Sequence, residues 1–421
     1  MERGVSSLRK GRRFPLLLAA FVLLLGLGLR AYWFHVDERS PDEQHYTSLA
    51  AGIAREGPGW QAHIVREFNR HGDPYPWPHR FGFTMLLAGC MRVTGFSTEE
   101  TGELLSTLAS VGAMAVVGAI AFAELDPWIG VLAMFFLAAS PLDLALARRA
   151  WQEDVVSLIA MAMLWSFLRA WRGVRSGWIA FFLIGGFALI VKESLRIPFG
   201  LGVAGLAFAE WRRLRTWTAP ARVLAGAALV AAVAAGIEVA AYGGWREMQA
   251  MFANMIEPSG PDSYERNYQT GGVDYYVTGL RILQPLPFLL GYLATLTALA
   301  GPAPPLSRLD TPRARVALRT LAIYVAIFSV IAAAFKTKNM RFLSPIFGAV
   351  ALLAASWLVA AIRTVPSRLG SAMRRLAAAV ALVVVLGFAV RDLRRFHHYF
   401  VEYQIQDLAT PWFTEVDEGK L

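Results

Sequence analysis

The chain has 421 residues, of which 56% are hydrophobic and only 17% are charged. Apolar residues in this proportion, gathered in long runs, exclude an ordinary water-soluble core and predict a polytopic membrane protein in contact with the lipid bilayer. The formal net charge of +10 comes without a basic soluble module or a base-reading motif, so nucleic acid is excluded as a partner.

Apolar runs suited to membrane crossing follow one another along most of the chain. A helix needs about 20 mostly apolar residues to span a bilayer. We predict an all-α integral membrane bundle of about 11 transmembrane helices, with ten and twelve as the alternatives. The predicted spans are Phe14–Phe34, Thr101–Ala123, Trp128–Leu146, Asp154–Trp171, Gly177–Val191, Ile197–Ala209, Ala219–Tyr242, Gly279–Ala300, Val316–Phe335, Arg341–Ile362 and Leu376–Val390.

The first span follows a basic run, but its apolar region is longer than a signal-peptide core, so we interpret it as a retained anchor. Short cytoplasmic loops retain Lys and Arg, which predicts the orientation of the bundle. With a cytoplasmic N-terminus, the Arg clusters at 169–175, 212–215, 308–315 and 363–375 face inward only if Phe81–Thr94 does not cross. We therefore predict that this 14-residue stretch lies along the interface.

This topology divides the chain into a transmembrane domain, residues 1–390, and an extracytoplasmic tail, residues 391–421. Within the domain, a large first extracytoplasmic loop with interfacial helices covers residues 35–100, and a second long loop covers residues 243–278. Arg391, Arg394 and Arg395 resist the scheme because they follow the last span on the outer side. Either that helix is misread, or these arginines meet lipid headgroups or an anionic ligand.

Two acidic clusters lie on the predicted outer side. Asp42 and Glu43 follow the first span closely and lead into an amphipathic stretch, Tyr46–Arg55. Their alternative interpretation is a helix N-terminus, where acids in the first turn are favoured by the helix dipole. The second cluster, residues 148–154, contains Arg149, Glu153 and Asp154, and its alternative interpretation is an interfacial charge patch with a tryptophan anchor.

Two clusters rich in cations lie on the same predicted side. Lys192, Glu193 and Arg196 are wedged between two short apolar segments, where charges are costly and normally paired or functional. The structural alternative is a local pair of Glu193 with Lys192 or Arg196. The late segment from Lys336 to Arg341 holds three cations and no acid, which favours an anion site over simple snorkelling.

Carboxylates and separate cations on one membrane face are suited to transferring a group from an anionic lipid. A carboxylate can deprotonate an acceptor hydroxyl while cations stabilise the departing phosphate. Composition alone leaves a transporter or flippase of an anionic lipid as an open alternative. The acids Asp42 and Glu43 favour the enzyme, because a flippase needs no base in a water-accessible loop.

At these residues the chain resembles the GT-C superfamily of lipid-phosphate-sugar-dependent glycosyltransferases. It is most similar to the group of dolichyl-phosphate-mannose protein mannosyltransferases and lipid A aminoarabinose transferases. The resemblance extends over about Leu17–Ala361. Its motifs are Asp42-Glu43 with Tyr46, the embedded helix from Gly82 to Gly95, Ser140-Pro141 followed by Arg149 and Asp154, Lys192 after a Gly-rich span, and Lys336 to Pro345.

The resemblance implies an inverting glycosyltransferase that takes a sugar from a polyprenyl-phosphate donor. The acceptor would be a protein, lipid or glycan on the extracytoplasmic face, and the expected location is a bacterial cytoplasmic membrane. Asp42 would be the general base, with Glu43 and Asp154 as further acids of the catalytic group.

The remaining assignments concern binding of the two substrates. Lys192, Arg196, Lys336, Lys338 and Arg341 would bind the donor phosphate, and Tyr46, Arg80, Arg149 and Glu153 would bind substrate. A divalent cation, held by Asp42 and Asp154 if by any residues, is left open.

Overall fold

The computed structural model describes residues 2–33, 36, 39–71, 80–256, 268–301, 305–309, 311–366 and 370–419. Within these ranges every regular element is a helix. In the described part of the chain, seven helices are long and apolar enough to cross a membrane, and an eighth candidate is a pair of helices bent by 63°. The predicted class, a polytopic helical membrane protein, is confirmed, whereas the count of eleven crossings stays a prediction.

The chain divides into two compact units. The terminal unit contains the N-terminal helix, the chain from Ala109 to Leu146, and the chain from Tyr268 onward. The loop unit contains Val36–Leu108 and Ala147–Asn267. Helix α5, Thr98–Glu124, begins in the loop unit and ends in the terminal unit.

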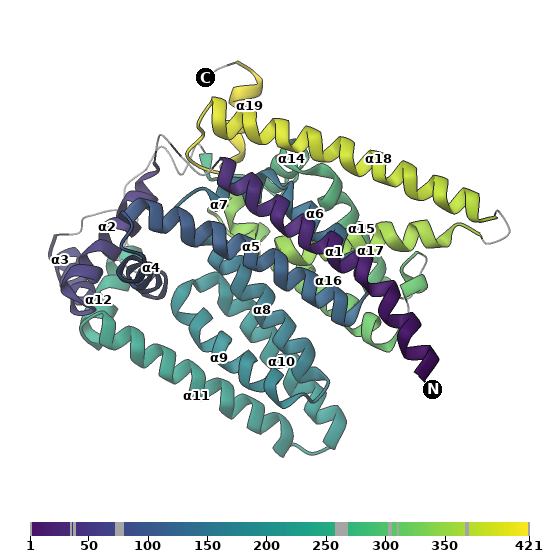
Figure 1. Ribbon diagram of the computed structural model, residues 1–421. Coiled ribbons are helices and arrows are strands. Elements are labelled where there is room, and N and C mark those ends of the chain that lie inside the picture. Colours follow the sequence, from purple (N-terminus) through teal and green to yellow (C-terminus); the bar gives the residue numbers. More distant parts are fainter. Residues whose placement is uncertain are drawn as a thin grey trace. The chain divides into compact units, whose positions relative to one another are not determined.

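The loop unit consists of four neighbouring apolar helices with shorter helices at one end (Figure 1). Its helices are α2 (Pro41–Glu56), α3 (Gly59–His71), α4 (Phe81–Thr94), α8 (Glu153–Trp171), α9 (Arg175–Val191), the 3₁₀ turn η1 (Glu193–Leu195), α10 (Arg196–Leu214), α11 (Thr218–Ala241) and α12 (Trp245–Ile256). A buried apolar cluster that includes Val65, Phe81, Tyr242 and Met251 joins α3, α4, the end of α11 and α12.

Helix α4 is the short helix expected from the sequence. Gly95 ends it in the left-handed conformation, with φ of 67°, which glycine adopts without strain. Gly82 near its start allows close approach to the end of α9, because a Cβ there would lie 2.6 Å from the carbonyl oxygen of Ile190. The helix is therefore packed against α2 and α9. That it lies along the interface stays a prediction.

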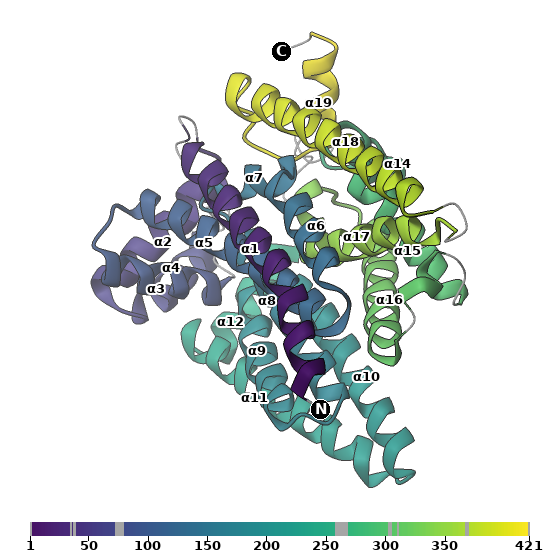
Figure 2. The same cartoon turned by 45° about the vertical axis from the view of Figure 1, so that its right-hand side comes forward.

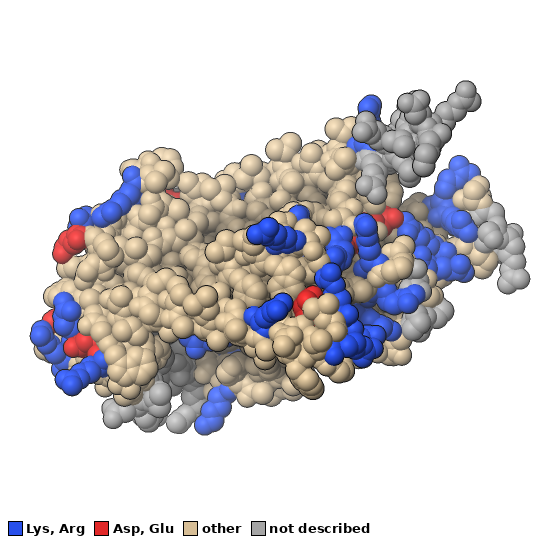
Figure 3. All heavy atoms as spheres, turned by 90° about the horizontal axis from the view of Figure 1, so that it is seen from below, with Lys and Arg blue, Asp and Glu red and all other residues tan. Residues whose placement is uncertain are grey.

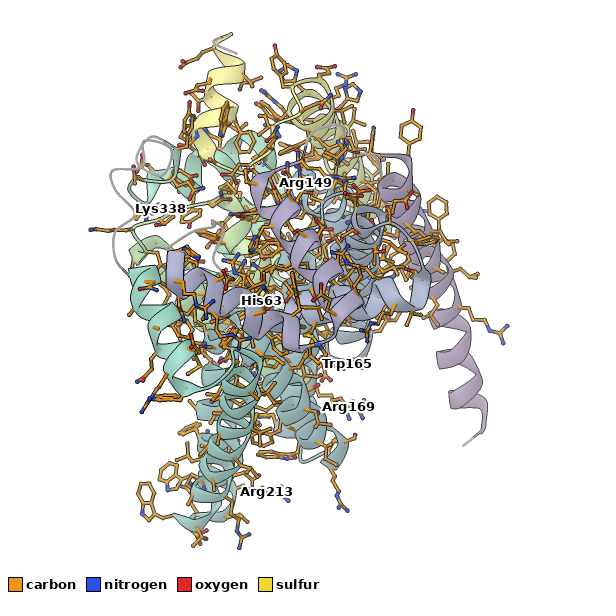
Figure 4. All side chains as sticks on the ribbon, turned by 90° about the vertical axis from the view of Figure 1, so that its left-hand side faces the viewer. His63, Arg149, Trp165, Arg169, Arg213 and Lys338 are labelled. Atoms are coloured by element: carbon orange, nitrogen blue, oxygen red, sulfur yellow. The ribbon has the colours of Figure 1, made fainter. Side chains whose placement is uncertain are left out.

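Charge differs between the two ends of the loop unit. The α8–α9 and α10–α11 turns carry exposed arginines at positions 172, 175, 212, 213 and 215. Figure 4 shows Arg149 before α8, Trp165 and Arg169 successively further along it, and Arg213 beyond them. On the face seen in Figure 3, Lys and Arg side chains gather with few acids among them. This pattern is typical of the cytoplasmic ends of membrane helices.

The terminal unit contains most of the remaining long helices (Figure 2). They are α1 (Glu2–Tyr32), α6 (Pro127–Ala138), α7 (Pro141–Ala147), α14 (Asp274–Leu283), α15 (Pro285–Ala300), η2 (Leu306–Leu309), α16 (Pro312–Ala334), η3 (Met340–Ile346), α17 (Phe347–Thr364), α18 (Gly370–Phe396), the π-helical turn η5 (His397–Glu402) and α19 (Thr410–Asp417). Helix α17 packs against α6, α15 and α16, so it lies in the core of this unit.

Two predicted spans are broken in the terminal unit. Trp128–Leu146 forms α6 and α7, and the bend between them holds a buried ion pair of Arg30 with Asp143, to which Ser110 Oγ also donates at 2.5 Å. Gly279–Ala300 is interrupted at Gln284, which lies between α14 and α15 and donates its side-chain amide to Phe136 O at 3.2 Å. Pro285 explains this second break, since proline restricts the residue before it to non-helical backbone.

Helices α11 and α18 are suited to contact with lipid. Only 11% of the apolar window of each is buried within the protein. Side chains such as Leu229 and Val383 are 66% and 69% exposed although both are aliphatic. Exposed apolar faces of this length are stable in a bilayer and unfavourable in water.

Candidate functional site

The first acidic cluster is built on the start of α2. Ser40 is the N-cap, and its side chain accepts a hydrogen bond from the backbone of Glu43, while Glu43 accepts from the backbone of Ser40. This reciprocal arrangement is a capping box, which satisfies two backbone donors that the helix itself leaves without partners. The helix-start interpretation is therefore correct for this segment, and Pro41 and Asp42 occupy its first turn.

Glu43 has a structural role as well as a capping one. Its Oε2 accepts from Arg149 Nη1 at 2.7 Å, and its Oε1 accepts from the backbone of Ala150 at 3.0 Å. The side chains of Glu43 and Arg149 are 1% and 3% exposed. Trp151 donates from Nε1 to Ser40 Oγ at 3.0 Å, and the Arg149 guanidinium lies over its ring. The start of α2 is thereby fixed to the chain before α8.

Asp42 is also buried, 8% exposed, but it precedes Glu43 and its carboxylate influences different groups. Burial lowers the pKa of His45 to about 4, and the negative charge of Asp42 opposes that shift. Asp42 likewise favours the charged form of Arg80. Asp42, His45 and Arg80 therefore form one electrostatic group at the start of α2 and α4.

Arg80 is held in a strained backbone conformation, with φ of 133° and ψ of 41°. Non-glycine residues in this region cost about 1–3 kcal/mol and gather at functional sites. Its guanidinium donates to Tyr46 Oη and, with the Gln152 amide turned oxygen-inward, donates to that oxygen from Nε and Nη1 at 3.1 and 2.8 Å. Its Nη2 lies 3.6 Å from Glu193 Oε1.

The electrostatics of Arg80 follow from these neighbours. Burial lowers the pKa of the guanidinium, but Tyr46, Glu193, Glu153 and Asp42 raise it by more, so the group stays charged. Arg80 is thus a permanent cation. It belongs to the polar cluster of the loop unit, which we define as Glu43, Tyr46, Arg80, Arg149, Gln152, Glu153, Lys192 and Glu193. Pro78 and His79, which precede it, lie outside the described residues.

Lys192 pairs with a residue distant in sequence. Its Nζ lies 2.6 Å from Glu153 Oε1, and both side chains are almost fully buried. Glu193, considered from the sequence as a local partner of Lys192 or Arg196, has its Oε1 3.6 Å from Arg80 Nη2. Burial lowers the pKa of Lys192, and the carboxylate of Glu153 opposes that shift. Asp154 is buried beside this pair in the first turn of α8, whereas Arg196 is exposed.

The donor set does not suggest a metal centre. Among the described residues, no three or more His, Cys, Asp and Glu side chains are arranged to hold a metal ion. Asp42 and Asp154 therefore do not form part of such a group, and no step below depends on a divalent cation.

The basic segment, residues 336–341, belongs to the terminal unit and follows α16. Lys336 is exposed, whereas Lys338 is 3% exposed and donates from Nζ to the carbonyls of Ala333 and Phe335 at 2.9 and 2.5 Å. An ammonium at this position satisfies carbonyls that end a helix. Arg341 is the second residue of η3 and is partly exposed. Within this segment, Lys336 and Arg341 are more exposed than Lys338.

The outer arginines that resisted the topology are mostly engaged within the terminal unit. They lie in the last turns of α18, which continues to Phe396. Arg391 is 2.7 Å from Asp392 and also donates to Ile282 O at 2.8 Å, and Arg395 is 2.7 Å from Asp417. Two of the three arginines therefore stabilise the protein itself.

Sequence reasoning assigned Glu43, Arg149, Glu153 and Lys192 to the site but missed how they pair. The signal for Glu43 was present, because Ser40 and Glu43 have the spacing of a capping box. No local pattern indicates the pair of Lys192 with Glu153, which are 39 positions apart. The strained backbone of Arg80 and the role of Asp407, described below, also leave no sequence signature.

These features define a helical membrane protein with buried acids at the start of α2 and several buried cations. Its fold is similar to that of several solved membrane proteins. The crystal structure of ArnT from Cupriavidus metallidurans in the apo state matches over 94% of this chain and 73% of its own, with TM-score 0.50 and 15% identity. The Archaeoglobus fulgidus oligosaccharyltransferase in the apo form matches over 91% and 56%, with TM-score 0.61 and 15% identity.

A further match is the oligosaccharyltransferase AglB from the same archaeon, in complex with an inhibitory peptide and a dolichol-phosphate. It has TM-score 0.55, 13% identity and coverage of 95% and 56%. The chain thus spans little more than half of the archaeal proteins. Residues 78–237, less than half of the chain, match the family model for dolichyl-phosphate-mannose-protein mannosyltransferase. No curated protein sequence matches significantly.

Proposed function

We propose that the protein is an inverting membrane glycosyltransferase that moves a sugar from a polyprenyl phosphate to an acceptor on the extracytoplasmic face. The observation that carries this proposal is the start of α2, where the buried carboxylate of Asp42 directly precedes Glu43, which is bonded to Arg149 and Ala150, and favours the charged form of Arg80. The family match over residues 78–237 supports it, since that stretch includes Arg80, Arg149, Asp154 and Lys192. The archaeal AglB supplies a precedent for a bound dolichol-phosphate on this fold.

In the proposed reaction, the acceptor's nucleophilic atom attacks the anomeric carbon from the face opposite the phosphate. The new bond forms as the bond from carbon to phosphate oxygen breaks, and the phosphate leaves with its electron pair. Asp42 takes the proton of the acceptor and later returns it to solvent. Phosphate is a good leaving group, so cations that stabilise its charge replace a general acid.

The cations proposed to bind the donor phosphate belong to both units, and each unit is considered separately. In the loop unit, Arg80 and Arg196 are proposed for the phosphate, with Lys192 as a buried charge whose contact with Glu153 orients it. In the terminal unit, Lys336 and Arg341 are the stronger candidates, because Lys338 would have to leave two helix-end carbonyls to bind a ligand. Tyr46 and Arg149 are proposed to shape the substrate site, and Asp154 to organise the acceptor.

The test is transfer of label by the purified protein from a panel of radiolabelled polyprenyl-phosphate sugars. Asp42→Asn keeps shape and removes the basic carboxylate, so turnover should fall by about 10²–10⁴. Donor binding should be preserved. Glu56→Gln, an exposed acid in the last turn of the same helix, is the matched control and should leave turnover unchanged.

An Asp42→Asn variant within about threefold of wild type, far below that range, would contradict the assignment of the base. Asp154→Asn would then be tested in the same assay. If both variants stay active, the transferase proposal fails in this form, and a transporter or flippase of an anionic lipid becomes the leading function.

A further inference from the structure

A partly buried carboxylate near the C-terminus joins three segments of the terminal unit. Asp407 Oδ1 accepts from Asn339 Nδ2 at 2.6 Å and from the backbone of Leu408 at 2.8 Å. Its Oδ2 accepts from Gln269 Nε2 at 3.0 Å. One side chain therefore connects the chain before α14, the basic segment 336–341 and the chain before α19.

The backbone of the basic segment is held from both sides at the same place. Lys338 donates its backbone N–H to Gln269 O at 2.6 Å, and Met340 donates to Leu408 O at 3.0 Å. Between them, Asn339 is fully buried and extended, with φ of −155° and ψ of 141°. The segment is thus held in a clamp by the chain at Gln269 and the chain at Leu408, in addition to the support that it receives from α16 and η3.

Asn339 transmits this clamp to Arg341. Its side-chain nitrogen is bound by Asp407, and its side-chain oxygen accepts from the backbone N–H of Arg341 at 3.1 Å as the N-cap of η3. The two ends of one amide therefore link Asp407 to the residue that carries a candidate phosphate-binding guanidinium. Rotation of Asn339 would move the start of η3 and Arg341 with it.

We propose that Asp407 is a positioning residue for the basic segment, so that the C-terminal segment sets the geometry of an anion site for a lipid-linked phosphate. This inference rests on the proposed function of the basic segment. The effect is geometric, because a carboxylate beside cations opposes anion binding electrostatically. Asp407 and Leu408, which precede α19, thereby become part of the donor site's support.

The geometric origin makes two substitutions at Asp407 behave differently. Asp407→Ala removes every bond of the clamp made by the side chain. The donor KM should rise about ten- to hundredfold, as expected for loss of a positioned charged contact. Asp407→Asn can still accept from Asn339 and Leu408, and Gln269 can turn its amide to receive the new N–H. The donor KM should then stay at the wild-type value or fall.

The experiment measures donor KM and kcat of the full chain, with thermal unfolding in parallel. Binding of a radiolabelled polyprenyl phosphate without sugar, in phosphatidylcholine vesicles, is measured for the same variants. The kcat at saturating donor should change little in Asp407→Ala. Asp417→Ala is the matched control, since Asp417 contacts Arg395 and Tyr399. It should lower the unfolding temperature without raising donor KM.

An unchanged donor KM in Asp407→Ala overturns the inference, and so does an equal rise in Asp417→Ala, which would mark a general loss of stability. If Asp407→Ala does not fold, Gln269→Ala removes one leg of the clamp. It should raise donor KM about threefold, less than loss of a whole charged contact, and an unchanged value would overturn the inference. Absence of transfer by wild-type protein would refute the proposed function, whereas the vesicle binding assay still tests the clamp.

Discussion

Replacing the carboxylate by an amide should affect different properties at the neighbouring acids Asp42 and Glu43. At Asp42 it should lower turnover, and at Glu43 it should lower stability. Glu43 accepts from the backbone and hydroxyl of Ser40 at 2.9 and 3.0 Å, from Arg149 at 2.7 Å and from the backbone of Ala150 at 3.0 Å. Glu43→Gln replaces one acceptor oxygen by an N–H donor that must face another donor. It also leaves the buried guanidinium of Arg149 without its counter-charge.

Breaking a buried ion pair from one side costs about 3–5 kcal/mol, so the free energy of unfolding should fall by about that amount in Glu43→Gln. Arg149→Met tests the other partner, and the double variant isolates the pair. Because the two side chains interact directly, the double variant should be less destabilised than the sum of the single ones, by about 0.5–3 kcal/mol.

The assay is unfolding of the purified protein in detergent, followed by helical circular dichroism, with transfer activity normalised to the folded fraction. Normalised turnover of Glu43→Gln should stay within about tenfold of wild type, below the 10²–10⁴ expected for Asp42→Asn. A Glu43→Gln protein destabilised by less than about 0.5 kcal/mol, the size of an ordinary surface substitution, would refute the structural role of the Glu43–Arg149 pair. A normalised loss equal to that of Asp42→Asn would refute the division of roles.

Arg80→Gly relieves the strained backbone but deletes the guanidinium, so stability should change by no more than about 2 kcal/mol while turnover collapses; retained turnover would mean that the guanidinium is not needed. Burial holds the pKa of His45 near 4, below its ordinary value of 6.5, so the unfolded chain binds more protons between these values and stability falls as pH drops through them. His45→Gln should lessen that acid sensitivity in unfolding measured from pH 7 to 4, and an unaltered profile would contradict it. In a Cys90→Ser background, Ser97→Cys should react with an impermeant maleimide in intact cells, whereas Thr216→Cys in the α10–α11 turn should react only after permeabilisation. Labelling of Ser97→Cys only after permeabilisation would mean that α4 crosses the membrane.

The helices could be predicted from the sequence wherever a run of apolar residues or a helix-start residue indicates them locally. Long apolar runs predicted the spanning helices, and a helix start was the alternative interpretation of Asp42 and Glu43, which agrees with the start of α2. The breaks within Trp128–Leu146 and Gly279–Ala300 were missed because hydropathy does not register a bend. Pro141 and Pro285 each begin the helix after a break, so the local signal for both was present.

The candidate site was predicted as a set of residues and not as a set of pairs. Its acids and cations were identified from the membrane face on which each predicted loop lies, and that face was predicted from the distribution of Lys and Arg along the sequence. Their partners depend on helices that meet only in the folded chain, as Lys192 and Glu153 do across α9 and α8. The backbone of Arg80 and the clamp at Asp407 have the same origin, since each is imposed by tertiary contacts rather than by local preference.

The segment 148–154 organises the loop unit's polar cluster because consecutive side chains reach different elements. Arg149 binds Glu43 of α2, Gln152 accepts from Arg80 at the start of α4, and Glu153 binds Lys192 at the end of α9. Taking each of these charges out of water costs several kcal/mol, which a single pair repays poorly. Their combined effect is therefore better understood as fixing geometry than as adding stability. Asp42, in the first turn of α2, is held close to this framework, and its buried carboxylate is the base that we propose.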